Sequence, residues 1–268
     1  MSPEDYFLAL DSSDLGGGGW LGPTITTGWR TFILDALTKI ELNPVGLLLL
    51  REFQRYRVWV KIRPYTFEDV TDEKLYCAAE SGGNVEIEQD RRYGAFVRAS
   101  LERFSHGTLC ARRSAKQGGA VAEPHERLFH ELVHALRNIT ETTSYKHLRG
   151  GLKGYEEVEE FIAVLVTNIY ASAGGKKVLR ADWKGHRRLG GAFDSSLEYF
   201  RQGSMTYPIV ADFYAANKAF CLLLANIKAP FNPIRAFVEN TEEARRYSEG
   251  ATAKHRDGNL PASQLMYD

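Results

Sequence analysis

The segment His130-Glu131-Leu132-Val133-His134 constrains this chain more than any other. It lies within residues 128–139, where apolar side chains recur at the spacing of a helix that is buried on most of its surface. Glu123 as an N-cap, Pro124 in the first turn and Glu126 within that turn predict where this helix begins. Since positions i and i+4 share one face of a helix, both imidazoles can reach a single metal ion from one rigid element.

The H-E-x-x-H spacing is the one by which two histidines hold Zn²⁺ while the glutamate acts as a base. Glu131 follows the first candidate ligand, so its carboxylate projects beside the metal, where it can take a proton from an activated water. The plain alternative is a satisfied pair of core histidines or a solvated helix face. Because unpaired imidazoles are costly on a largely buried helix, the pattern favours His130 and His134 as ligands of a Zn²⁺ cofactor.

Catalytic zinc usually takes three protein ligands and keeps one position for water. Thr140 and Arg137 stand where the metzincin pattern needs its third His and its Gly, which excludes that family. Glu160 is predicted as the third ligand, because it opens directly into the apolar run 161–166, where a carboxylate is costly unless a cation neutralises it. Glu156, one turn earlier on the same predicted face, is the first alternative, and Glu157 is also left open as the ligand. Glu156 or Glu157 could instead orient a ligating histidine.

The H-E-L-V-H segment, followed by the acidic pair Glu159-Glu160 at the start of a second helix, resembles the gluzincin metallopeptidases. The run Glu160-Phe161-Ile162-Ala163 is similar to the Glu-Phe-x-Ala start of the second metal-binding helix in the anthrax lethal factor protease domain, although Val164 stands where that helix repeats an acid. The similarity covers residues 121–172 and extends loosely to secreted, NleD-like bacterial effector and toxin metallopeptidases. It implies a zincin-like α+β fold, mostly helical, with a small mixed sheet and two metal-binding helices.

The same resemblance implies a zinc-dependent endopeptidase whose partner is a protein or peptide substrate in a target cell. Zn²⁺ on His130, His134 and Glu160 would activate a water molecule, and Glu131 would pass its proton to the leaving amine. The donor that stabilises the oxyanion is left open among Tyr155, His186 and Tyr207. An exported effector or toxin would travel through a specialised secretion system, with a secretion-system carrier or an immunity protein as a further partner.

Two other classes of function stay open. The first is a zinc hydrolase of a non-protein amide, because the motif does not itself select a peptide. The second is a non-catalytic, zinc-binding interaction protein. Metal content and the activity of a Glu131 variant separate these classes.

Charge, cysteine content and hydropathy limit the partners, the disulfides and the location that we expect for this chain. Lys+Arg and Asp+Glu both number 34, which argues against nucleic acid or an anionic membrane as the main partner. The three cysteines, Cys77, Cys110 and Cys221, are far apart and odd in number, so buried thiols are expected rather than a disulfide scaffold. Neither a signal peptide nor an apolar run long enough to cross a bilayer is predicted, so without export the chain would be cytoplasmic.

The sequence is expected to form a flexible lead over residues 1–22, one domain over 23–248 and a polar tail over 249–268. Residues 91–120, rich in Arg and Gly, are interpreted as a solvated loop or as a basic rim on a substrate cleft. A strand over 85–88 could bind an extended substrate at its edge. The remaining expected elements are helices over 27–42, 45–53, 155–171 and 207–227, a short helix after Asn232-Pro233, and a strand over 57–62.

Overall fold

The computed structural model of the chain describes residues 2–11, 23–64, 80–82, 86–88, 91–99, 122–148, 155–182, 188–189 and 206–239. The described residues form an α+β structure in which helices dominate and the strands make one small sheet, as the sequence predicts. The chain divides into two units, Met1–Thr143 and Ser144–Asp268, and each is described by itself. The expected domain over 23–248 stays a prediction, and the tail over 249–268 lies outside the described residues.

The sheet belongs to the first unit and has the strand order β1-β2-β5-β3, with β4 also paired to β5. Strands β1, β2 and β5 run parallel, whereas β3 and β4 are antiparallel to β5. The predicted strand over 85–88 is confirmed for 86–88 as β4, and the one over 57–62 is confirmed as β2, which starts and ends two residues later. The bounds are β1 Leu8–Leu10, β2 Trp59–Pro64, β3 Glu80–Gly82, β4 Glu86–Glu88 and β5 Arg91–Ala99.

Strand β5 occupies residues 91–99 of the Arg-rich region 91–120, which corrects the expectation of a solvated loop or a basic rim for these residues. Its register against β2 shifts where Trp59 pairs with Tyr93 and Val60 pairs with Ala95, so Gly94 is an extra residue in β5. A Cβ atom on Gly94 would lie 2.6 Å from a Val58 methyl carbon. Burial still alternates along β5, since Tyr93, Ala95, Val97 and Ala99 are buried and the residues between them are partly exposed. The rest of the region, residues 100–120, lies outside the described residues.

The first residues of the expected flexible lead are part of the sheet, which corrects that prediction for residues 2–11. A 3-10 helix, η1 (Pro3–Tyr6), precedes β1, and Leu8 in β1 is fully buried. Leu8 pairs with Val60 of β2, so burial and strand pairing fix a segment that composition suggested was mobile. The remaining part of the lead, residues 12–22, lies outside the described residues.

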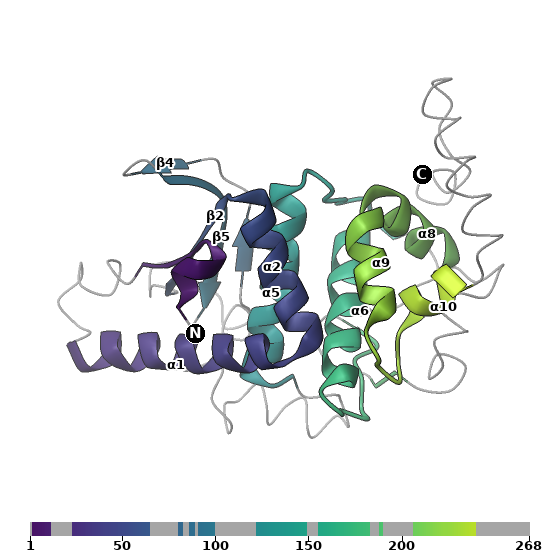
Figure 1. The fold of residues 1–268 in the computed structure, drawn as a ribbon, viewed down its shortest axis with the longest axis horizontal. Helices are drawn as coiled ribbons and strands as arrows, with labels where there is room; N and C mark the ends of the chain where they lie inside the picture. Colours follow the sequence, from purple (N-terminus) through teal and green to yellow (C-terminus); the bar gives the residue numbers. More distant parts are fainter. Residues whose placement is uncertain are drawn as a thin grey trace. The chain divides into compact units, whose positions relative to one another are not determined.

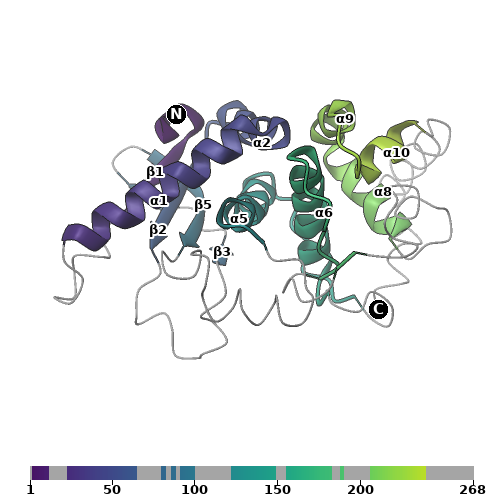
Figure 2. The same cartoon turned by 90° about the horizontal axis from the view of Figure 1, so that it is seen from below.

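Three helices of the first unit, α1 (Pro23–Leu42), α2 (Pro44–Tyr56) and α5 (Pro124–Ile139), pack beside the sheet (Figure 1, Figure 2). Asn43 caps the start of α2, since its side chain accepts a hydrogen bond of 2.9 Å from the Val45 N–H. Helices α1, α2 and α5 and strands β2 and β5 each contribute buried residues to this core: Trp29, Leu37, Leu49, Val60, Ile62, Val97 and Leu132. This packing holds α5 against β5 and β3.

The second unit is helical over its described residues: α6 (Val158–Ala173), α8 (Tyr207–Ala216), α9 (Lys218–Asn226) and α10 (Pro233–Glu239). Helix α6 ends at Gly174-Gly175, where Gly175 has φ +87° and its N–H donates to Ser172 O at 3.0 Å. The short helix after Asn232 is confirmed as α10. The single helix expected over 207–227 is wrong, because Asn217, with φ −128° and ψ +40°, separates α8 from α9.

Among the described residues, no single helix has both the length and the apolar character needed to cross a membrane. The bent pair α8 and α9, at 111° to each other, meets the criterion only when the two are joined. Cys221 is a fully buried thiol, as expected, whereas Cys77 and Cys110 lie outside the described residues.

Candidate metal centre

Helix α5 carries the H-E-x-x-H segment and begins as the sequence predicts. The Glu126 carboxylate accepts a hydrogen bond of 2.8 Å from the Glu123 N–H, which closes the first turn, and Pro124 opens the helix. Every side chain from residue 128 to residue 137 is buried. A helix buried on all sides over nearly three turns is a rigid support for the side chains that it carries.

His130 and His134 lie one turn apart on α5, and each is 7% exposed. Their Nε2 atoms are 3.1 Å apart, and their rings meet edge to face with a centroid separation of 4.7 Å. Two neutral imidazoles could share one proton across this distance. The same arrangement directs both lone pairs at one point, as two ligands of one ion require.

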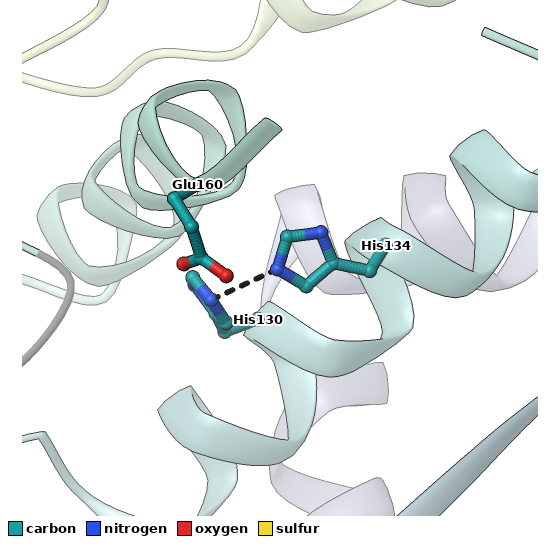
Figure 3. Close-up of side chains that lie close together, drawn as sticks. All are labelled: His130, His134 and Glu160. Atoms are coloured by element: carbon teal, nitrogen blue, oxygen red, sulfur yellow. Dashed lines mark hydrogen bonds between the residues drawn. The ribbon is translucent and has the colours of Figure 1, made fainter. Parts of the chain in front are cut away.

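Glu160 completes a group of three possible ligands. One ligand atom from each of His130, His134 and Glu160 lies within 4.8 Å of the others. Figure 3 shows the Glu160 carboxylate directed toward the two imidazole rings. The group can therefore hold a metal ion, as the sequence predicts.

The donor set and its spacing fit Zn²⁺. Two nitrogen ligands about 2.0–2.1 Å from a tetrahedral zinc ion lie roughly 3.3 Å apart. The observed separation of 3.1 Å between the two Nε2 atoms is close to that value. Two imidazoles and one carboxylate are also the ligand set of catalytic zinc sites in which water takes the fourth position.

The other acids near Glu160 differ from their predicted places. Helix α6 begins at Val158 rather than at residue 155, so Glu156 and Glu157 precede it and do not share a helical face with Glu160. Glu156 is exposed and Glu157 is half-buried. Among the acids 156, 157, 159 and 160, Glu159 is the most buried at 2% exposure, whereas Glu160, predicted to open into the buried run 161–166, is partly exposed. The structure places Glu160 alone among these acids in the metal-binding group.

Glu131 lies next to His130 and is 8% exposed. Of the three oxyanion candidates, Tyr155 is buried before α6 with its ring 5.2 Å from that of Phe161, and Tyr207 is the first residue of α8. His186 lies outside the described residues. The choice among the three stays open.

No protein-family model, curated protein or solved structure matches this chain. The interpretation of the centre therefore depends on its geometry and on the resemblance of its motifs.

Proposed function

We propose that this chain is a zinc-dependent endopeptidase with a zincin-like fold. Zn²⁺ would be held by His130, His134 and Glu160, and Glu131 would be the general base. The main support for the proposal is the group of possible ligands itself. Two buried imidazole nitrogens lie 3.1 Å apart, and the Glu160 carboxylate lies near them. The two histidines belong to an H-E-x-x-H motif, whose glutamate is Glu131. By resemblance, its substrate would be a protein in a target cell into which the chain is delivered as an effector or toxin.

A zinc ion bound by these three residues would act as a Lewis acid, which polarises a carbonyl and lowers the pKa of a water molecule toward neutrality. The Glu131 carboxylate would take one proton from that water as its oxygen bonds to the peptide carbonyl carbon. When the C–N bond breaks, Glu131 would return the proton to the leaving nitrogen, which departs as an amine. The position of Glu131 supports this role, because it follows His130 directly on the buried helix α5 and is itself 8% exposed.

A Glu131→Gln variant tests the proposal. The amide has nearly the same shape as the carboxylate but cannot accept the proton, so peptide cleavage should fall by about 10²–10⁴-fold while zinc stays bound. The assay is digestion of a peptide library followed by mass spectrometry. Glu156→Gln is the matched control, since Glu156 is exposed and outside the metal-binding group, and it should cleave like the wild type.

Undiminished cleavage by a zinc-loaded Glu131→Gln protein would refute the role of Glu131. A zinc-loaded wild type that cleaves small amides and no peptide would favour the alternative of a non-protein amide hydrolase. A wild type that binds zinc and hydrolyses neither would leave the non-catalytic, zinc-binding interaction protein.

A further inference from the structure

The chain that precedes α6 forms a short antiparallel ribbon within the second unit. Backbone hydrogen bonds of 3.0 Å run from the Leu148 N–H to Glu156 O and from the Val158 N–H to Lys146 O. The ribbon therefore ends where α6 begins.

Glu159 closes this ribbon through both its backbone and its side chain. Its N–H donates to Ser144 O at 2.9 Å, and its carboxylate accepts a hydrogen bond of 3.0 Å from the Ser144 N–H. The side chain is 2% exposed. Because a buried carboxylate is costly without hydrogen-bond donors, this reciprocal pair must form for Glu159 to occupy its place.

The ribbon also satisfies the start of the helix. The first N–H groups of an α-helix have no partner within the helix, and an unsupported first turn frays. In α6, the ribbon supplies acceptors for the N–H groups of Val158 and Glu159. Glu160 belongs to the same turn, so the hydrogen bonds that secure Glu159 also restrict the backbone of the predicted metal ligand.

We propose that Glu159 is a positioning residue for the metal centre, an inference that rests on the proposed zinc site. Its two hydrogen bonds to Ser144 hold the first turn of α6 and keep the adjacent Glu160 carboxylate ordered before the ion arrives. Ordering a ligand in advance raises metal affinity, because binding then costs less conformational entropy. Glu159 itself would not touch the ion.

The test measures zinc affinity by competition with a chelator in full-length variants. Glu159→Ala should weaken zinc binding by about 10–100-fold, as loss of groups that orient metal ligands does elsewhere. Glu159→Gln should stay within a few-fold of the wild type, because its amide oxygen can accept the same hydrogen bond from Ser144. Ser144→Pro, which removes the N–H donor, should behave like Glu159→Ala. Ser144→Ala, which keeps the N–H, is its matched control and should retain affinity.

Thermal unfolding of the metal-free proteins separates positioning from a merely structural role. Wild-type affinity in Glu159→Ala, or in Ser144→Pro if the first variant does not fold, would overturn the inference. Equal losses in Glu159→Gln and Glu159→Ala would also overturn it, since the hydrogen bond would then not be the cause. In either case a wild type that binds zinc leaves the proposed function intact, whereas a wild type that binds none refutes both.

Discussion

Removal of the Glu160 carboxylate should abolish most of the stability that zinc confers on the protein. A ligand that binds only the folded state stabilises it by RT ln(1 + [L]/Kd), which is about 2.7 kcal/mol at a free zinc concentration of 100 Kd. Loss of groups that only orient metal ligands weakens binding by about 10–100-fold. Loss of one of three direct ligands should reach at least the upper end of that range.

In Glu160→Ala at the same zinc concentration, [L]/Kd falls to about 1 and the stabilisation falls to about 0.4 kcal/mol. At roughly 2–4 °C per kcal/mol, the shift in Tm caused by zinc should shrink from about 5–11 °C to about 1–2 °C. The assay is thermal unfolding of each variant with and without zinc, so any effect of the substitution on the metal-free protein cancels.

Glu156→Ala is the control for this prediction. Glu156 is exposed, precedes α6 and lies outside the metal-binding group, so this variant should keep the zinc-induced shift of the wild type. A Glu160→Ala protein with an undiminished shift would refute the assignment of Glu160. So would a loss of the shift in Glu156→Ala alone, which would move the third ligand to that residue.

Two further predictions concern the first unit. Gly46→Ala should lower the free energy of unfolding, measured in urea, by about 1 kcal/mol or more. The reason is a clash, because the new Cβ would lie 1.9 Å from Ile40 O, and this outweighs the helix preference of alanine, which is about 1 kcal/mol. An equal or higher free energy of unfolding would contradict this prediction. Burial, and then the hydrogen bond to Glu41, raise the pKa of Tyr6 to about 12. The protonated phenol therefore stabilises the fold fully below pH 10, and this contribution is lost as the pH rises toward 12. The fall in urea midpoint over that interval should be smaller in Tyr6→Phe, and an equal fall would show that Tyr6 is not the cause.

The sequence predicted helix α5 well because several independent signals agree there. Apolar periodicity, the Pro124 start and the 130/134 spacing all describe local geometry, which a single helix fixes without help from the rest of the chain. The group formed with Glu160 was also predicted, because a carboxylate at the start of an apolar run needs a compensating partner.

What the sequence could not show depends on tertiary contacts. The start of α6 at Val158 depends on the ribbon from Ser144, so no local pattern near residue 155 indicated it. The same hydrogen bonds explain why Glu159 rather than Glu160 is the deeply buried acid. In the sequence, an acid in the first turn of a helix is explained by its favourable interaction with the helix dipole, so nothing predicted the burial of Glu159 or its hydrogen bonds to Ser144.

The most direct test of the proposed zinc site is the metal content of the purified protein. Elemental analysis should find about one zinc ion per chain in the wild type, because three convergent ligands on two helices form a site of the kind that binds zinc tightly. A His130→Ala/His134→Ala double variant, shown by circular dichroism to keep its helices, should contain essentially none. Equal amounts of zinc in the two proteins would contradict the site at His130, His134 and Glu160.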